Sequence, residues 1–272
     1  MSRGLRAKDN RQKALAICCW LLRLLLESML SNRHHFAMTG KHSIASLIAL
    51  LAATPSTETV FNPYDASTDC GATCRCNLSL YLNELRSRQT TTLLLGEAPG
   101  YQGCRLTGIP FTSEHILLNG VPSLGMLGVA KGYRRSTTGD RLKKEPSATI
   151  VWQALELFQF LPLLWPAFPY HPHKPGNGQS NRVPTSKEIA FGRPVWQQLV
   201  EIMGIEQIVA IGNVAHGSLT AAGIEAKKIR HPSQGGKPQF VEGIRLLALN
   251  QSHQSIDVEP HLPNAGIDSL TQ

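Results

Sequence analysis

Long hydrophobic runs, aromatic side chains and charged side chains are all scarce in this chain of 272 residues. Aromatic residues make up 6% and charged residues 17% of the sequence. No window approaches the roughly 18 uninterrupted apolar residues that a membrane-spanning helix needs. These shortages exclude polytopic membrane proteins and collagenous or other fibrous proteins. Because 42% of the residues are hydrophobic, the chain can bury a core, and we expect one soluble globular domain.

The regular cysteine pairs of a zinc ribbon are also lacking. Of the six cysteines, Cys70, Cys74 and Cys76 form a C-x3-C-x-C cluster, and Cys104 stands alone further along. Four thiolates of this kind can hold a metal or an iron–sulfur cluster. The alternative is a set of scattered reduced thiols in a cytoplasmic protein. The irregular spacing favours the alternative, so we predict a cytoplasmic protein with no metal and no cofactor.

The positive charge is concentrated in two segments. Residues 1–41 hold eight Lys and Arg against two acidic residues, which accounts for +6 of the net charge of +8. A second basic segment, residues 131–145, contains Arg134 and Arg135 beside two glycines. It is either a solvated loop or a loop that contacts phosphates, and in the second case Arg134 and Arg135 are candidate DNA contacts.

The ends of the chain differ from its middle. Residues 14–26 resemble the apolar core of a signal peptide, but Arg23 interrupts the run and no small-x-small cleavage site follows closely. The sequence from Met38 onward already has the pattern of a complete domain. We therefore expect a dispensable extension at 1–37, a domain at 38–250 and a loose polar tail at 251–272.

Short apolar strands alternate with helical stretches from residue 43 onward. This alternation is typical of an α/β layer fold with a largely parallel sheet. Thr185 and Glu188 form a capping box at the start of one predicted helix. We expect strands at 91–95, 161–165, 207–211 and 226–230, and helices at 43–53, 78–88, 148–158, 185–203, 213–222 and 240–249.

Unusual loops follow the carboxyl ends of these strands, the edge at which open parallel sheets bind ligands. The first is GEAPGYQGCRLTGIPFTSE, residues 96–114, whose glycines allow backbone amides to approach an anion closely. Phe111 in this loop is either a core residue or a platform on which a planar base stacks.

Two later loops contain histidines. In WPAFPYHPHKPG, residues 165–176, His171 and His173 alternate with prolines and cannot share a helix face, which argues against a helical zinc motif. In RHPSQGGK, residues 230–237, a strand delivers His231 to a flexible loop. Because His-Pro-Ser at a strand end is an unusual place for a packing residue, His231 is a candidate functional group rather than a buried structural histidine.

The order of a strand, GEAPG, TGIPF, P-H-P-H-K-P-G and a late strand leading into HPS resembles the uracil-DNA glycosylase superfamily, in particular its GEAPG-bearing bacterial branches. The similarity covers about residues 59–250. It implies a three-layer α/β/α sandwich around a central four-stranded, mainly parallel sheet. It also implies excision of uracil from DNA without a required cofactor. We further expect a monomer with no membrane partner.

The resemblance assigns roles to individual residues. His231 would donate a hydrogen bond to the departing base, and Glu97 would orient or activate water. The base pocket would be formed by Gly96, Ala98, Pro99, Gly100, Tyr101, Phe111 and Ser233. DNA would be contacted by Gln234, Gly235, Gly236 and Lys237, together with Arg134 and Arg135.

Three positions depart from the family pattern. Ala98 replaces an aspartate that activates water in the best-known branch, and Gly100 replaces a tyrosine that excludes the thymine methyl group. Gly100 thus implies room for 5-substituted or larger bases. Pro166 stands where related sequences have an asparagine that reads the uracil edge, and proline has no amide to do so.

Three functions remain open from the sequence. The leading one is a monofunctional DNA glycosylase that hydrolyses the N-glycosidic bond of uracil or a related deaminated base. The departures at Ala98 and Pro166 leave a second, a glycosylase-like module that binds DNA or damaged bases with weak or no catalysis. A metal-dependent nucleotide or phosphoester hydrolase is the third, and the lack of an acidic metal cluster weighs against it.

Overall fold

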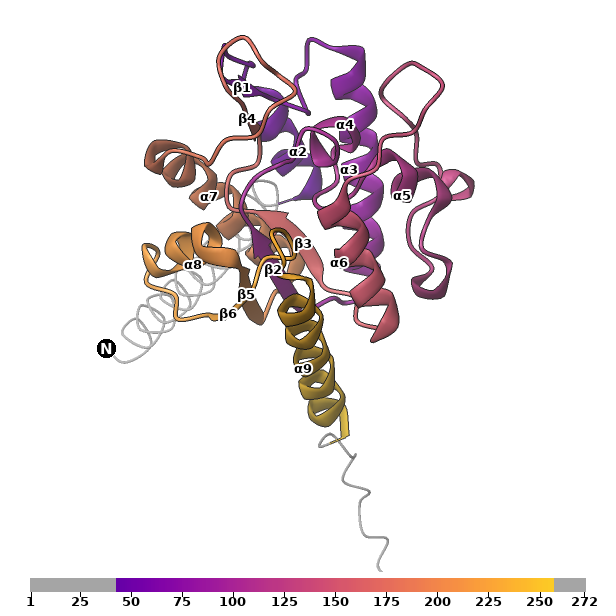
Figure 1. The fold of residues 1–272 in the computed structure, drawn as a ribbon, viewed down its shortest axis with the longest axis vertical. Coiled ribbons are helices and arrows are strands. Elements are labelled where there is room, and N and C mark those ends of the chain that lie inside the picture. Colours follow the sequence, from indigo (N-terminus) through magenta and orange to yellow (C-terminus); the bar gives the residue numbers. More distant parts are fainter. Residues whose placement is uncertain (1–42, 257–272) are drawn as a thin grey trace, which may run out of the picture.

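The centre of the molecule is a four-stranded sheet in which all neighbouring strands are parallel. The computed structural model describes residues 43–256. The strands lie in the order β3-β2-β5-β6, with β2 at Thr92–Gly96, β3 at Leu163–Pro166, β5 at Gln207–Ile211 and β6 at Lys227–Ile229. Helices cover both faces of this sheet, which confirms the predicted α/β class and its parallel sheet (Figure 1).

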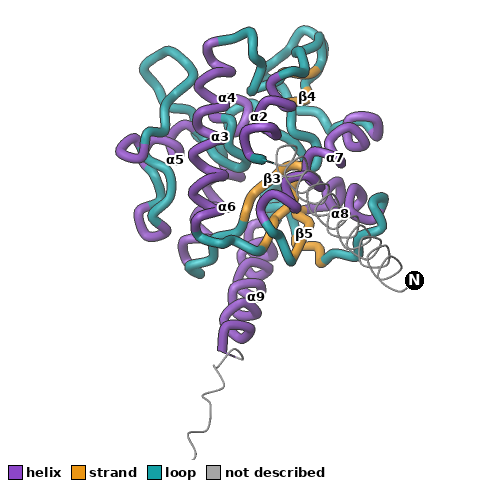
Figure 2. Tube along the Cα trace, turned by 180° about the vertical axis from the view of Figure 1, so that it is seen from behind, coloured by secondary structure: helices purple, strands orange, loops and turns teal. Residues whose placement is uncertain are grey.

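The helices form the two outer layers. Helices α7 and α8 lie on one side of the sheet and α3 and α6 on the other, as both views of the chain show (Figures 1 and 2). The α-helices are α2 (Ile44–Ala52), α3 (Asp69–Ser87), α4 (Cys104–Thr107), α5 (Glu114–Asn119), α6 (Pro146–Leu157), α7 (Ser186–Met203), α8 (Gly212–Thr220) and α9 (Lys237–Ile256). Two 3-10 helices lie at Pro122–Leu124 and Val129–Lys131, and β1 (Val60–Phe61) pairs antiparallel with β4 (His171–Pro172).

The sequence explains why β2 is central. Every residue of its TLLLG segment is buried, as expected for a strand with helices on both faces. Leu93 pairs in register with Leu163 of β3 on one side and Ile208 of β5 on the other. The chain therefore leaves β2 first toward β3 and later returns to β5. This reversal of direction places a topological switch point at the carboxyl end of β2, the usual ligand position in such sheets.

Two helices are longer than the sequence indicated. Helix α3 begins at Asp69, after an N-cap at Thr68, because Cys74 and Leu78 continue one buried helical face. Helix α9 begins at Lys237 and continues to Ile256, so the prediction of a loose tail is wrong for residues 251–256. The Gln251 amide donates a hydrogen bond of 2.9 Å to Thr92 Oγ1 and attaches the end of α9 to β2.

Some of the expected secondary structure was incomplete, and some expectations concern residues that the structure does not describe. Helices α4 and α5 and the small β1–β4 pair were not predicted, and His171 lies in a strand instead of a loop. The predicted capping box of Thr185 and Glu188 is present. Residues 1–37 and 257–272 lie outside the described part of the chain. Within residues 43–256, no helix combines the length and apolar character needed to cross a bilayer.

Candidate functional site

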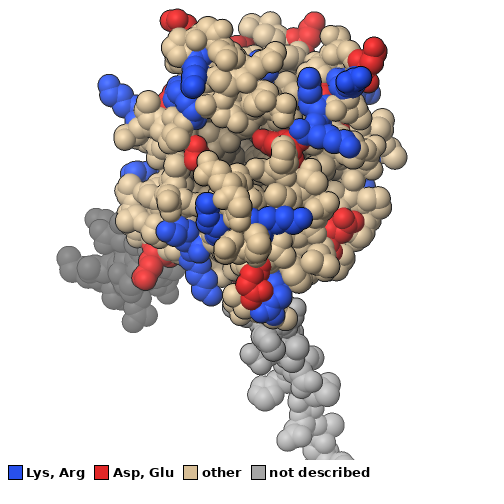
Figure 3. All heavy atoms as spheres, viewed as in Figure 1, with Lys and Arg blue, Asp and Glu red and all other residues tan. Residues whose placement is uncertain are grey.

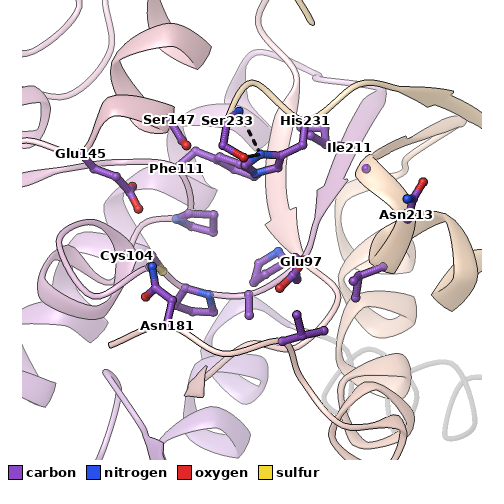
Figure 4. Close-up of a pocket in the computed structure, with 18 of the residues that line it drawn as sticks. Glu97, Cys104, Phe111, Glu145, Ser147, Asn181, Ile211, Asn213, His231 and Ser233 are labelled. Carbon is purple, nitrogen blue, oxygen red and sulfur yellow. Dashed lines mark hydrogen bonds between the residues drawn. The ribbon is translucent and has the colours of Figure 1, made fainter. Parts of the chain in front are cut away.

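A cavity of about 500 Å³ opens at the carboxyl ends of β2, β3, β5 and β6. This volume is within the range of about 300 to 1,000 Å³ that ligand pockets commonly have. The loop after β2 and the HPS loop after β6 form parts of its wall, so two loops far apart in sequence meet in one site (Figure 4). Further lining residues come from β3, from the start of α6 and from the start of α8.

Phe111 is held in the cavity by close packing against the end of β2. A Cβ atom placed on Gly96 would lie 2.4 Å from Cζ of the Phe111 ring, so only glycine permits this approach. Phe111 itself has a φ of 51°, a strained conformation for an aromatic residue. Its ring centroid lies 6.4 Å from that of His231. The half-buried ring thus lines the cavity beside the histidine.

The hydrogen bonds of His231 define which of its nitrogens carries the proton. The backbone N–H of Ser233 lies 3.2 Å from Nδ1, and Ser233 Oγ lies 2.8 Å from the same atom (Figure 4). Because a backbone N–H only donates, Nδ1 is the acceptor and Nε2 carries the hydrogen. Burial, with a smaller contribution from Arg230, lowers the pKa of His231. A neutral imidazole with a donor at Nε2 therefore lines the cavity.

Glu97 contributes a carboxyl group to the same cavity. Its side chain is half-buried, and burial raises its pKa above the usual value. None of the described residues donates a hydrogen bond to this carboxylate. The backbone of Glu97 is nevertheless fixed, since its carbonyl accepts a hydrogen bond of 3.1 Å from the N–H of Phe168 beyond β3. Glu97 can accept a proton or orient water from a fixed position.

The P-H-P-H segment supports the loop after β2. His171 is fully buried, and its Nδ1 donates a hydrogen bond of 2.7 Å to the carbonyl of Pro99. Burial lowers the pKa of His171 to about 4, so its ring is neutral at pH 7. From the adjoining loop, Asn181 Oδ1 accepts a hydrogen bond of 3.1 Å from the N–H of Tyr101. Both residues position the glycine-rich loop.

Most of the residues predicted to form the base pocket lie together. The predicted residues that line the cavity are Glu97, Ala98, Pro99, Gly100, Phe111, His231, Ser233 and Gln234. The predicted residues that are outside the lining are Gly96, Tyr101, Gly235, Gly236 and Lys237. Gly96 lies against the Phe111 ring, and Gly236 precedes α9, which starts at Lys237. Pro166 also lines the cavity, at the end of β3.

The two arginines of the basic loop differ in their surroundings. Arg135 pairs with the buried carboxylate of Glu114, with 2.9 Å between Nε and Oε1. Its Nη2 also donates a hydrogen bond of 2.9 Å to the carbonyl of Arg141, and Nη1 donates to Gly139. Arg134 is exposed. The structure therefore gives Arg135 an internal role instead of the predicted free position for DNA, whereas Arg134 faces solvent.

Positive side chains gather on the face shown in Figure 3, on opposite sides of a central hollow. Among the residues that line the cavity, Arg182 and Arg230 are basic. Arg182 is held by Glu188, with 2.6 Å between Nη2 and Oε1. The exposed basic residues of the loop before α6 are Arg134, Arg141, Lys143 and Lys144.

Sequence reasoning missed six polar residues of the cavity: Glu145, Ser147, Asn181, Arg182, Asn213 and Arg230. Glu145 was counted only as a negative charge within the basic loop. Its side chain is half-buried, and burial raises its pKa to about 7. The available signal was its place directly before Pro146, which marks the first turn of α6.

The clustered cysteines pack as ordinary thiols. Cys74 and Cys104 are buried, and burial raises the pKa of Cys74 to about 12, which keeps it protonated. The Cys74 thiol donates to the carbonyl of Leu106, and the Cys104 sulfur lies 3.9 Å from the Tyr64 hydroxyl. Within the described residues, no three His, Cys, Asp or Glu side chains are grouped to hold a metal ion.

Comparisons with known proteins give one kind of match. No protein-family model and no curated protein matches the sequence. Among solved structures, the chain is similar to the crystal structure of wild-type Pedobacter heparinus SMUG2, with a TM-score of 0.53 and 13% sequence identity. The match covers 79% of this chain and 98% of that one. The likeness establishes a shared fold and supports the predicted arrangement of layers.

Proposed function

We propose that this chain is a monofunctional DNA glycosylase that hydrolyses the N-glycosidic bond of uracil or a related deaminated base in DNA. The observation that carries the proposal is the neutral His231, whose Nδ1 is occupied by Ser233 in a cavity that also contains Phe111 and Glu97. The fold shared with Pedobacter heparinus SMUG2 and the resemblance of the GEAPG and HPS loops to the uracil-DNA glycosylase superfamily support it.

His231 stabilises the departing base. When the bond between C1′ of the sugar and N1 of uracil breaks, its electron pair stays with the base and negative charge grows on O2. A neutral N–H donor at Nε2 strengthens its hydrogen bond as that charge develops, so it stabilises the transition state more than the ground state. Ser233 holds the ring and its tautomer and so prepares the donor.

Phe111 and Glu97 complete the chemistry. The target nucleotide leaves the duplex, because its glycosidic carbon cannot be reached inside the stack. Its base then stacks on the Phe111 ring, a contact worth about 1 to 3 kcal/mol. The ionised carboxylate of Glu97 orients a water molecule, whose oxygen bonds to C1′ and whose proton passes to the carboxylate. The products are an abasic sugar and the free base.

DNA is the partner in this proposal. The basic face around the hollow attracts phosphates in a salt-dependent manner, with Arg134 as an exposed candidate contact. Gln234 lines the cavity, and Gly235 and Gly236 connect it to Lys237 at the start of α9. In this proposal these residues lie next to the DNA strand from which the nucleotide is extruded. The chain acts as a cytoplasmic monomer and requires no cofactor.

A second candidate is a glycosylase-like module that binds DNA or damaged bases with weak or no catalysis. Ala98 and Pro166 both line the cavity, and neither side chain can activate water or pair with the edge of a base. This candidate shares the fold, the cavity and the basic face with the first. It differs in predicting binding without release of any base.

Single-turnover assays on uracil-containing single and double strands distinguish the two. Loss of one preorganised donor usually costs about 100- to 1,000-fold in rate, so we expect that drop for His231→Ala. Half-buried His216 on α8, which is outside the cavity lining, is the matched control when replaced by alanine and should not change the rate. Release that persists in His231→Ala contradicts the proposed mechanism. DNA binding without release of any tested base supports the binding module.

A further inference from the structure

The carboxyl group of Glu145 occupies the space that two glycines of the first loop leave open. A Cβ atom on Gly100 would lie 2.1 Å from Glu145 Oε1, and one on Gly103 would lie 2.1 Å from Oε2. Glu145 therefore already occupies the place that a side chain on Gly100 would take, which bears on the expectation that Gly100 leaves room for 5-substituted bases. The absent side chain at Gly100 is replaced by one that reaches the cavity from the start of α6.

This carboxyl group has no structural partner. No described residue forms a hydrogen bond or an ion pair with it, and burial is the cause of its raised pKa. It does not cap α6 either, since no side-chain capping bond is present at this N-cap. Burial keeps the carboxyl largely neutral up to about pH 7. Unpaired ionisable groups in a cavity are typical of functional sites.

The loop before α6 fixes Glu145 in this position. Lys143, two residues earlier, donates its N–H to the buried carboxylate of Glu114 at 2.9 Å, and its carbonyl accepts from the N–H of His115 at 3.2 Å. Arg135 pairs with the same carboxylate from the other end of the loop. The basic loop is thus attached to α5 immediately before it delivers Glu145 to the cavity.

The position of Glu145 relative to a bound base follows from ring geometry. In Figure 4, Glu145 and His231 lie on opposite sides of Phe111. In a pyrimidine, C5 lies directly across the ring from C2. A base that stacks on Phe111 with O2 at His231 therefore turns its C4–C5 edge toward Glu145.

We propose that Glu145 is a specificity-determining residue that closes the pocket at the C4–C5 edge of the base. The inference rests on the proposed function and deepens it. The neutral carboxyl donates its O–H to O4 of uracil, a contact that Pro166 cannot provide, and its bulk leaves no space for a substituent on C5. The pocket accordingly accepts uracil and excludes thymine, in which a methyl group occupies that space.

The test compares base release from single strands containing uracil, thymine or 5-hydroxymethyluracil. Glu145→Ala removes the bulk and the donor, whereas Glu145→Gln keeps both in a neutral side chain of the same size. Glu156→Ala, at the other end of α6, is the control for loss of a carboxyl group from this helix. We expect the thymine-to-uracil rate ratio to rise at least tenfold in Glu145→Ala and to stay at the wild-type value in Glu145→Gln and Glu156→Ala.

The outcomes separate this inference from the proposed function. If uracil is released, His231→Ala abolishes the release, and Glu145→Ala leaves the ratio within twofold of wild type, the glycosylase stands and the role of Glu145 falls. If the wild type releases no base, the proposed function fails, and the ratio is measured instead as affinity for strands with uracil or thymine on 2′-fluoro sugars. A thymine-to-uracil affinity ratio that is unchanged in Glu145→Ala overturns the inference, whereas a tenfold rise in this ratio supports it.

Discussion

Replacement of Arg135 with alanine would leave the carboxylate of Glu114 buried without its ionic partner. The Glu114 side chain has no solvent exposure and accepts hydrogen bonds from Arg135 Nε at 2.9 Å, Arg135 Nη2 at 3.3 Å, the N–H of Lys143 and the hydroxyl of Thr137. Burial by itself would raise the pKa of Glu114, but the hydrogen bonds from these groups outweigh burial and hold it below the usual value. Arg135 supplies two of the four bonds.

The expected cost of this substitution is large. Removal of one partner of a buried ion pair costs about 3 to 5 kcal/mol, because the other charge stays uncompensated. For a domain of this size, 1 kcal/mol lowers Tm by about 2 to 4 °C, so the expected loss is about 6 to 20 °C. The pH dependence has a defined sign. In the wild type, the stabilisation by ionised Glu114 is present above its unfolded-state pKa and lost as the pH falls. In Arg135→Ala, protonation of Glu114 at low pH removes the cost of its buried, uncompensated charge.

Thermal and urea unfolding at pH 7.5 and pH 5 measure both effects. Arg135→Ala should lose more stability at pH 7.5 than at pH 5, relative to wild type at each pH. Exposed Arg134, replaced by alanine, is the matched control and should remain within about 0.5 kcal/mol of wild type. A Tm of Arg135→Ala within 2 °C of wild type, combined with weaker and less salt-dependent DNA binding, would refute the internal role of Arg135 and restore it as a phosphate contact.

Three further predictions concern the base platform, the loop support and the basic face. Phe111→Leu should keep the fold but reduce single-turnover base release by about 5- to 150-fold, since stacking is worth about 1 to 3 kcal/mol; an unchanged rate would make Phe111 a core residue only. Burial lowers the pKa of His171 to about 4, so the contribution of the neutral ring to folding stability is present above pH 6.5 and lost as the pH falls toward 4. In the wild type, the free energy of unfolding measured with urea should fall by up to about 3 kcal/mol as the pH is lowered between those values, and His171→Gln should remove that fall. A fall of the same size in His171→Gln would contradict a neutral buried ring. Arg134→Ala should reduce the salt slope of DNA affinity by about 1, and an equal slope would leave Arg134 as a solvated side chain.

The sheet and the meeting of two loops could be predicted because both depend on local patterns. Strand β5 was expected at 207–211 and lies at Gln207–Ile211. The loops that contain Glu97 and His231 follow parallel strands, and the carboxyl ends of parallel strands share one edge. The proximity of these two loops therefore follows from the strand pattern alone, without contacts between residues distant in the sequence.

The residues that surround these loops depend on distant contacts and could not be predicted. Glu145 reaches the cavity only because the preceding loop is attached to α5 through Glu114, which lies far from it in sequence. The support of Pro99 by His171 requires the chain between β3 and α7 to pass under the first loop. Neither contact has a local periodic signal. Strand and helix patterns report burial of one face, whereas these contacts depend on the path of irregular segments.

The two carboxyl groups of the cavity can hold different charges at the same pH. Burial raises the pKa of both Glu97 and Glu145, and the rise is larger for Glu145, to about 7. As the pH rises, Glu97 therefore ionises first, and Glu145 keeps its proton to a higher pH. Water activation needs an ionised carboxylate, whereas a carboxyl group that faces O4 of a departing anionic base needs its proton. Pairs of titratable groups with separated pKa values commonly divide the roles of base and acid in this way. Since loss of the proton from Glu145 would place a negative charge against the anionic base, uracil release should fall above about pH 7 in the wild type, and Glu145→Gln should remove that decline.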